Sequence, residues 1–322
     1  MRRPVLKTLA AAALALAAGT TLAQGLPAKT LRWIVPYPAG GGSDFLARSI
    51  GQTLQAQIGQ SVVVDNKPGA NTAIGAVETI RSAPDGSTVL SADNGTMVFN
   101  PALYKKLSYD PKDLVPVALM GRFPMILVAN PQAGYADAKA FIAAAKAKPG
   151  QISFASAGAG SPHHLAMEML KSELGLFMVH VPYRGAAPAL QEVAGGQLPV
   201  MMTDLAAGNA LIKAGKLKPL AVAHSARLPQ LPEVPTFAEL GIKGVEAAAL
   251  VGMVAPAGTP ADTVAALARA VGTAIKDPAV SKRLVEFGVE PVGSTPAQYA
   301  DLLKSETTRW HKLIRERQIT LD

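Results

Sequence analysis

The chain of 322 residues is 49% hydrophobic and 17% charged, which favours folded cores over disorder, and at roughly 150 residues per domain it predicts two domains or one large one. It contains no cysteine, which excludes disulfides, thiolate metal sites, cysteine nucleophiles and a lipid-modified cysteine. The net charge of +8 is spread along a chain with only 5% aromatic residues, and this argues against a nucleic-acid-binding protein.

The first 23 residues have the layout of a secretory signal peptide. Arg2, Arg3 and Lys7 form a basic start, an alanine–leucine run covers residues 9–18, and small residues flank Leu22. The apolar run is shorter than the ~20 residues that a membrane anchor needs. We therefore expect export to the periplasm, cleavage after Ala23, and no membrane insertion of the mature chain.

The stretch from Trp33 to Phe45 predicts a binding loop. An apolar strand over residues 31–35 leads into two prolines and three consecutive glycines, and Ser43 and Asp44 then open a helix. Glycine lets backbone N–H groups approach a ligand closely, and the first N–H groups of a helix have no intrahelical partner. Together these features favour an anion such as a carboxylate. The alternative is a plain strand-to-helix connection with Ser43 or Asp44 as the N-cap.

Strands and helices alternate after this loop. We expect a helix over 44–59, a strand over 61–65, a helix over 72–82 and a strand over 87–91, followed by a polar loop at 93–96. This order implies a parallel sheet with right-handed crossovers, and ligands of such sheets lie beyond the carboxyl ends of the strands. The glycine loop and the polar loop both fall at that edge.

The middle of the chain repeats the pattern of strand, small polar loop and helix. Strands over 115–120 and 125–130 precede a second glycine loop at 156–161, which leads into a helix over 163–174. Two such units predict two α/β lobes around a cleft. The remaining predicted elements are helices over 137–147, 187–195, 207–214, 261–276, 279–287 and 295–318, and strands over 152–155, 178–181, 197–203, 219–223 and 247–255.

Common enzyme motifs are missing, because the chain contains no Walker, Rossmann, G-x-S-x-G or H-E-x-x-H pattern. His163, His164 and Glu168 invite a metal interpretation, but adjacent histidines diverge by about 100° on a helix, and two ligands do not make a site. We therefore expect no metal, no cofactor and no catalysis. An alternative from another class is a secreted hydrolase with a triad of Ser156, His164 and Asp204, although no nucleophile elbow supports it.

The order of several motifs resembles the Bug-type extracytoplasmic solute receptors, the substrate-binding components of tripartite tricarboxylate transporters. The matches run nearly end to end. They are I-V-P-Y-P-A-G-G at 34–41, D-N-K-P-G-A at 65–70, A-P-D-G at 83–86, N-P at 100–101, L-Y at 103–104, Y-D-P at 109–111, S-A-G at 156–158, V-P-Y-R-G-A-A-P-A-L at 181–190 and A-P-A-G-T-P at 255–260.

The resemblance implies an α/β protein with a two-lobed periplasmic-binding-protein (Venus-flytrap) fold, each lobe a mixed sheet flanked by helices. Lobe 1 would comprise residues 24–125 and 253–322, and lobe 2 residues 126–252. The lobes would close on a small carboxylate ligand, held by backbone and hydroxyl groups of the two glycine loops and partly through ordered water. A monomeric receptor would then deliver the ligand to inner-membrane permease subunits.

We predict a ligand site made mainly of neutral donors at the ends of strands in both lobes. The predicted contacts are Tyr37, Ala39, Gly40, Gly41, Ser43, Asp44, Thr96, Ser156, Ala157, Gly158, Ser161, His164, Tyr183, Arg184, Gly185 and Asp204. Of these, Thr96, His164, Tyr183 and Asp204 are carried over from the resemblance.

The sequence leaves the identity of the ligand open. Residues 248–252 read A-A-L-V-G where relatives often place aromatic residues before the glycine, so an aromatic ligand is not indicated. Arg184 is compatible with a second acidic group on the ligand or with a solvated surface. The same fold could also bind an uncharged or amide ligand, or serve as the input of a sensor.

Overall fold

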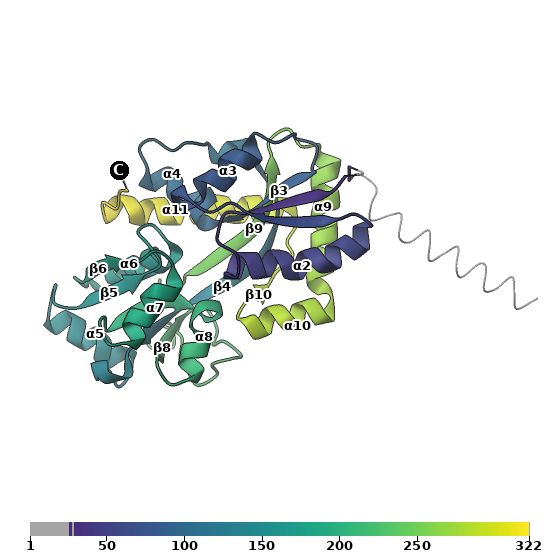
Figure 1. Ribbon diagram of the computed structural model, residues 1–322. Helices are drawn as coiled ribbons and strands as arrows, with labels where there is room; N and C mark the ends of the chain where they lie inside the picture. The colour runs from purple at the N-terminus through teal and green to yellow at the C-terminus, as the bar shows by residue number, and fades with distance from the viewer. Residues whose placement is uncertain (1–25, 28, 322) are drawn as a thin grey trace, which may run out of the picture.

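The computed structural model describes residues 26, 27 and 29–321, which form two α/β halves joined through their sheets (Figure 1). The signal peptide predicted over residues 1–23 lies outside the described residues. Among the described helices, none combines the length and the apolar character needed to cross a bilayer.

The first half begins with three parallel strands that are each followed by a helix or helical turn. Its elements are β1 (Leu31–Val35), α2 (Gly42–Ile58), β2 (Val62–Asn66), η1 (Ala70–Thr72), α3 (Ala73–Ile80), β3 (Thr88–Asp93), η2 (Gly95–Phe99), α4 (Asn100–Leu103) and η3 (Pro111–Asp113). The side chains of Trp33, Ile34 and Val35 in β1 are fully buried, as expected for a parallel strand covered on both faces. β1 pairs in parallel with both β2 and β3, so the loops after all three strands lie at one edge of the sheet.

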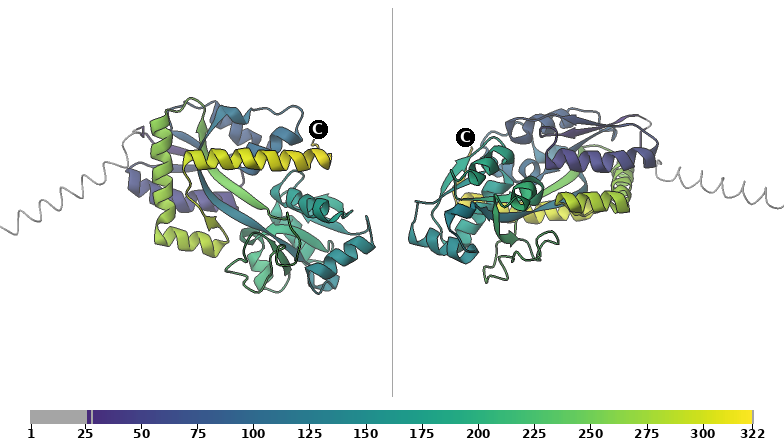
Figure 2. Two further views of the ribbon diagram at one scale, coloured as in Figure 1. Left: turned by 180° about the vertical axis from the view of Figure 1, so that it is seen from behind. Right: turned by 60° about the horizontal axis from the view of Figure 1, so that its bottom comes forward.

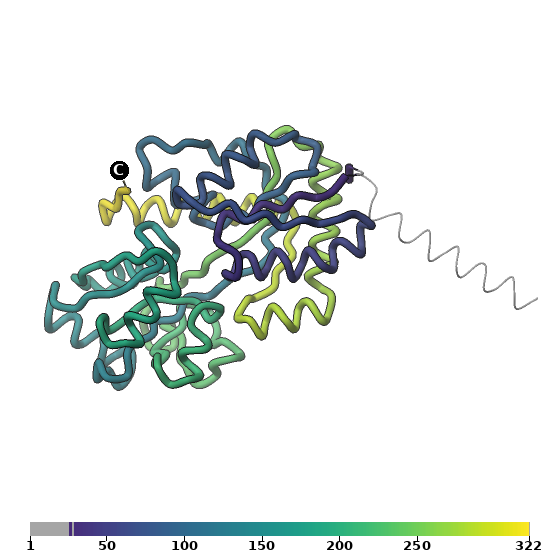
Figure 3. Tube along the Cα trace, in the orientation of Figure 1, coloured from purple at the N-terminus to yellow at the C-terminus, as the bar shows by residue number. Residues whose placement is uncertain are grey.

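One strand of 16 residues, β4 (Leu114–Ala129), runs through both halves, and Figure 3 shows its path from one half into the other. Its first part pairs antiparallel with β9 (Ala248–Pro256) as far as Pro124, and its last five residues pair with strands of the second half. The prediction of two separate strands over 115–120 and 125–130 is therefore wrong, because irregularities in the ladder absorb the breaks that the sequence indicated.

The second half repeats the strand–helix pattern. Its elements are η4 (Pro131–Ala133), α5 (Ala138–Ala147), β5 (Ser153–Ser156), α6 (Pro162–Leu174), β6 (Val179–Pro182), α7 (Ala186–Ala194), β7 (Val200–Asp204), α8 (Leu205–Lys213) and β8 (Lys218–Ala223). β5 pairs in parallel with both β6 and β7, and β7 pairs antiparallel with β4. The second glycine loop follows β5, and residues 183–185 follow β6, so both lie at the carboxyl edge of this sheet.

After β8 the chain returns to the first half and ends in helices. The last elements are β9, α9 (Ala261–Lys276), α10 (Pro278–Phe287), β10 (Glu290–Pro291) and α11 (Pro296–Glu316). β9 lies between β3 and β4, which gives the strand order β2-β1-β3-β9-β4-β7-β5-β6. Residues 248–252 pair with residues 119–124 of β4, and the predicted boundary between the lobes at 252 and 253 stays a prediction.

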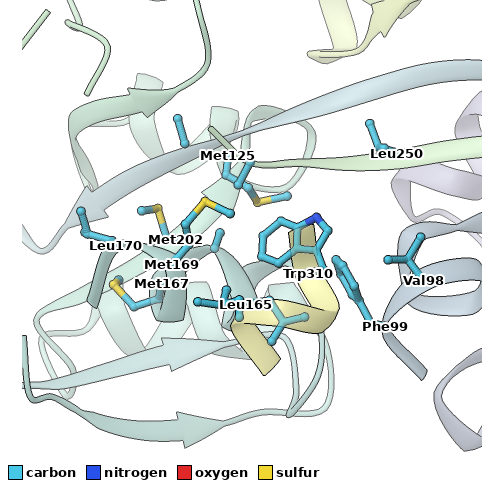
Figure 4. Close-up of a cluster of buried hydrophobic side chains, with 14 of the residues drawn as sticks. Val98, Phe99, Met125, Leu165, Met167, Met169, Leu170, Met202, Leu250 and Trp310 are labelled. Atoms are coloured by element: carbon cyan, nitrogen blue, oxygen red, sulfur yellow. The ribbon is translucent and has the colours of Figure 1, made fainter. Parts of the chain in front are cut away.

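The C-terminal helix α11 contacts both halves (Figure 2). Its Trp310 packs edge-on against Phe99 of the first half, with ring centroids 5.0 Å apart. Figure 4 shows the other side of Trp310 facing α6 and buried methionines of the second half, including Met125, Met167 and Met202. Arg317, just beyond the helix, lies 3.2 Å from Glu168 of α6. The two halves therefore share one continuous core cluster.

Candidate functional site

The first glycine loop ends at an uncapped helix. Gly41 is the N-cap residue of α2, and no side chain accepts a hydrogen bond from the first turn there. Ala39, Gly40 and Gly41 are exposed. Ser43 lies in the first turn, and its buried Oγ has no hydrogen-bond partner among the described residues. This end of α2 therefore combines free backbone N–H groups, the positive end of the helix dipole and an unused hydroxyl.

Asp44 faces into the protein and braces this loop. Its carboxylate accepts hydrogen bonds from the Gly40 amide at 2.9 Å, from Arg48 Nε at 3.0 Å and from Asn66 Nδ2 at 2.9 Å. Burial alone would raise the pKa of Asp44, but the hydrogen bonds from Arg48, Gly40 and Asn66 outweigh it and hold the pKa below its ordinary value. The ionised carboxylate thus fixes the loop, and its predicted contact with a ligand stays a prediction.

Asp93, the last residue of β3, holds two predicted site residues in place. The Tyr37 hydroxyl donates to the Asp93 carboxylate, and Thr96 donates to it from its amide at 2.8 Å and from Oγ1 at 2.9 Å. Burial, together with the neighbouring carboxylate, raises the pKa of Tyr37 well above its ordinary value. Thr96 belongs to the π-helical turn η2, so the prediction of a polar loop over 93–96 is wrong: Asp93 accepts from the first turn and lets the helix begin there.

The loop after β2 contains a strained turn that the sequence did not indicate. Ala70, Asn71 and Thr72 have φ angles of 45°, 47° and 76°, and left-handed backbone costs about 1–2 kcal/mol per residue outside glycine. Hydrogen bonds of 2.8 Å and 2.7 Å join Asn71 to Asn100, and Thr96 Oγ1 lies 2.8 Å from Thr72 Oγ1. Strain of this kind clusters at functional sites, and this turn shares the sheet edge with the first glycine loop.

The second glycine loop engages its own polar groups. Ser161 Oγ caps α6 by accepting from the His164 amide at 3.3 Å, and it donates to the Gly158 carbonyl at 2.7 Å. The Gly158 amide donates to Ser156 Oγ at 3.1 Å, and the Gly160 amide donates to His164 Nδ1 at 3.1 Å. Because these groups are paired within the loop, fewer of them are available to a ligand than at the first loop.

Gly160 is the point where this second loop meets the first half. A Cβ added to Gly160 would lie 2.7 Å from Leu103, 2.8 Å from Leu321 and 3.5 Å from Asn71 Nδ2. The second glycine loop therefore packs against the strained turn and the C-terminal tail.

Two stacked histidines lie behind the second loop. The rings of His164 and His180 are 3.8 Å apart and nearly parallel, and Ser156 Oγ is 2.6 Å from His180 Nε2. Burial lowers the pKa of His164 to about 3 and that of His180 to about 4, with smaller contributions from neighbouring groups, so both rings are neutral at pH 7. His180 was missed because it belongs to no motif, and only the pairing of β5 with β6 brings it beside Ser156.

The triad considered as an alternative, that of a secreted hydrolase, is not assembled. Ser156 Oγ is hydrogen-bonded to His180. Asp204 Oδ2 lies 3.1 Å from Nε2 of His163, and Asp204 Oδ1 caps α8 by accepting from the Ala207 amide. Burial raises the pKa of Asp204, but the hydrogen bond and charge of His163 outweigh it, and the net shift is downward. Ser156 is also 0% exposed, so its hydroxyl is not presented to a substrate.

Residues 183–185 lie beside the second loop. The Tyr183 amide donates to the Ser156 carbonyl and the Gly185 amide to the Ala157 carbonyl, both at 3.0 Å. α7 begins directly after Gly185 with no side-chain cap, and Arg184 is exposed. This edge of the second half therefore presents a second uncapped helix N-terminus with a guanidinium next to it.

Within the described ranges, no three histidine, aspartate or glutamate side chains are grouped so that they could hold a metal. Glu168, which the sequence placed near His164, is 3.8 Å from that ring and is paired with Lys171 and Arg317 instead. Its carboxylate is therefore engaged in a buried ion-pair cluster.

Comparison with known proteins places the chain in a family. The model of the tripartite tricarboxylate transporter family receptors matches residues 46–319. A protein from the tcbD–tcbE intergenic region of Pseudomonas sp. (strain P51) is 38% identical, over 96% of this chain and 94% of its own length. Protein BugT of Bordetella pertussis is 36% identical, over 90% of each chain.

Solved structures agree with the fold. R. palustris Rpa4515 with adipate is 32% identical with a TM-score of 0.83, and the match covers 90% of this chain and 97% of that one. MatC from Rhodopseudomonas palustris with bound malate is 32% identical with a TM-score of 0.80, covering 90% and 100%. The predicted periplasmic-binding-protein fold and the resemblance to Bug-type receptors are thus confirmed. The chain belongs to the tripartite tricarboxylate transporter family of receptors.

Proposed function

We propose that this receptor binds a small organic acid, with one carboxylate of the ligand at the N-terminus of α2. The observation that carries the proposal is the uncapped helix start at Gly41, next to an exposed glycine loop and the unpartnered Oγ of Ser43. Helix N-termini bind anions through their free N–H groups and dipole. Neutral amide donors also lose less solvation free energy on closure than a buried charge would.

Two observations support a carboxylate ligand. Two solved relatives hold adipate and malate, and both of these ligands are carboxylates. In this chain the second half offers Arg184 and the uncapped start of α7 beside Ala157 and Gly158. A second acidic group on the ligand fits this charge, and contacts from both halves would favour closure on the ligand.

Membership of the family supports a wider role. We propose that the receptor is exported, loses its signal peptide after Ala23, and works in the periplasm as a monomer that delivers its ligand to inner-membrane permease subunits. It needs no cofactor and binds no nucleic acid, and the buried Ser156 supports a receptor that releases its ligand unchanged.

Thermal unfolding of the mature chain with a panel of mono-, di- and tricarboxylates and their matched amides tests the proposal. A ligand at a hundred times its Kd adds about 2.7 kcal/mol, which raises Tm by roughly 5–10 °C for a chain of this size. We expect a shift with at least one acid and none with its amide. A response to amides alone would contradict carboxylate binding.

Gly41→Asp, compared with Gly41→Asn, tests the place of the carboxylate. Gly41 has a φ of −80°, and an added Cβ would meet only the Pro38 carbonyl oxygen at 3.7 Å, so both variants should fold. We expect the new carboxylate of Gly41→Asp to abolish binding by repulsion, while Gly41→Asn retains more of it. Unchanged, wild-type affinity in both variants, measured by calorimetry, would remove the start of α2 from the site.

A further inference from the structure

Asp93 is a buried carboxylate that is held by neutral donors. It is 4% exposed, and its hydrogen bonds among the described residues come from the Tyr37 hydroxyl and from the amide and hydroxyl of Thr96. Hydrogen bonds of this kind satisfy the oxygens of a buried carboxylate, which would otherwise be costly to remove from water.

The direction of each hydroxyl hydrogen follows from these hydrogen bonds. A hydroxyl carries one hydrogen, and an ionised carboxylate only accepts. The hydrogen of Tyr37 therefore points at Asp93, and so does that of Thr96, because a charged acceptor is stronger than the neighbouring hydroxyl of Thr72. Nearby donors are also used by neighbouring backbone carbonyls. The Tyr109 hydroxyl donates to the Thr96 carbonyl at 2.7 Å, and the Asn100 amide group donates to the Asn71 carbonyl at 2.7 Å.

This arrangement changes what Tyr37 can offer a ligand. Tyr37 is half-buried at the start of the first glycine loop, and its hydroxyl hydrogen is already used. The oxygen can then present only a lone pair, with the charge of Asp93 behind it. Tyr37 was predicted as a donor to the ligand carboxylate, and this geometry leaves its oxygen as a hydrogen-bond acceptor.

We infer that Asp93, acting through Tyr37, makes the site select a carboxylate ligand that also carries a hydrogen-bond donor, a hydroxyl or amino group, near that carboxylate. The plain acid of the same chain length would leave the acceptor oxygen unpaired, and an unpaired buried polar group weakens binding. The inference rests on the proposed binding of a carboxylate at α2. In this assignment Asp93 is a positioning residue.

Calorimetry on the mature chain with matched acids tests the inference. The sets are propionate, lactate and alanine; succinate, malate and aspartate; and glutarate, 2-hydroxyglutarate and glutamate. Within the set that binds, we expect the hydroxy or amino member to bind at least about tenfold tighter than the plain acid. The hydroxy and amino members together identify which donor is preferred.

The variant Asp93→Asn removes the charge while keeping the size of the side chain. It also frees the Tyr37 hydroxyl to donate, so we expect the preference for the hydroxy or amino acid over the plain acid to fall below about threefold. Asp301→Asn makes the same charge change on the exposed surface of α11 and should keep the full preference. If Asp93→Asn does not fold, Tyr37→Phe removes the acceptor oxygen and should abolish the preference instead.

The outcomes separate the inference from the proposed function. Wild-type protein that binds plain and substituted acids equally, or a preference that survives in Asp93→Asn or Tyr37→Phe, would overturn the inference and leave the carboxylate receptor standing. Binding of none of the acids, in this panel and in the thermal one, would instead overturn the proposed function.

Discussion

The two glycine loops look alike in the sequence and differ in the structure. The first loop leaves the start of α2 uncapped, with Ser43 Oγ unpartnered and its glycines exposed. The second loop is capped by Ser161, bonded to His164 through Gly160, and packed against the first half. A glycine-rich strand-to-helix loop can therefore serve either to present free amides or to allow close packing.

We propose that the first loop serves ligand binding and the second serves contact between the halves. At the first loop the start of α2 has no side-chain cap, and Asp44 holds the loop through the Gly40 amide and Asn66. At the second loop the polar groups stabilise the loop itself, and Gly160 touches the strained turn of the other half. We expect substitutions in the first loop to change affinity and those in the second to change stability.

The largest expected effect is a loss of stability in acid that begins at the second loop. The folded pKa values of His164 and His180, about 3 and about 4, lie below the ordinary value of about 6.5. The unfolded chain therefore binds protons first as the pH falls, so this stability is present above pH ~6.5 and is lost toward pH ~4. We expect each histidine to contribute a loss of up to about 3 kcal/mol between these values, measured by urea unfolding.

The first loop should respond only at lower pH. The pKa of Asp44 is already lowered, so its contribution is present above the ordinary carboxyl pKa of about 3.9 and is lost below it. As the pH falls, the backbone amides of residues 156–164 should therefore lose protection from hydrogen exchange before those of residues 39–45. In His180→Gln, which keeps a polar partner for Ser156 but does not titrate, the acid loss should be smaller. An unchanged loss would show that the histidines are not its cause.

The second prediction compares Gly160→Ala with Gly40→Ala. Both glycines have positive φ, 76° and 86°, so both variants bear a backbone cost of about 1–2 kcal/mol. Only the Cβ at Gly160 would also lie within 3 Å of Leu103 and Leu321, whereas the Cβ at Gly40 meets open space. We expect Gly160→Ala to lower the free energy of unfolding by about 1–2 kcal/mol more than Gly40→Ala does. Equal losses would mean that Gly160 is not a tight contact.

The smallest expected effect is a difference in stability between the alanine variants of Ser161 and Ser43. Ser161 caps α6, so Ser161→Ala should lower the free energy of unfolding by about 1 kcal/mol. Ser43 has no partner for its Oγ, so Ser43→Ala should change the ligand-free stability by less than about 0.5 kcal/mol and still weaken ligand binding. A larger loss of ligand-free stability in Ser43→Ala than in Ser161→Ala would contradict the difference between the two loops.

Local features of this fold could be predicted from the sequence, and long-range ones could not. Glycines and prolines mark both loops and the starts of α2, α6 and α9, because backbone preferences act over a few residues. The continuity of β4 was missed, since its breaks at Gly121 and Pro124 are absorbed only by pairing with β9. An isolated segment shows no such pairing.

The candidate site also has parts that could be predicted from the sequence and parts that could not. The glycine loops could be located, but His180 and Asp93 depend on which residues the sheets bring together. The strained turn at 70–72 could not be foreseen either, because alanine, asparagine and threonine prefer other backbone conformations, and Asn100 and Thr96 hold the turn from a distance.

The unbroken path of β4 has a mechanical consequence. Because the strand continues from one half into the other, any rotation between the halves must be distributed as backbone twist over several residues. Pro124, where the two halves meet, has no N–H, so the ladder lacks a donor where this twisting is needed. We expect β4 and β9 to act as an elastic torsion element, with a restoring force that confines the motion to one axis and a small amplitude.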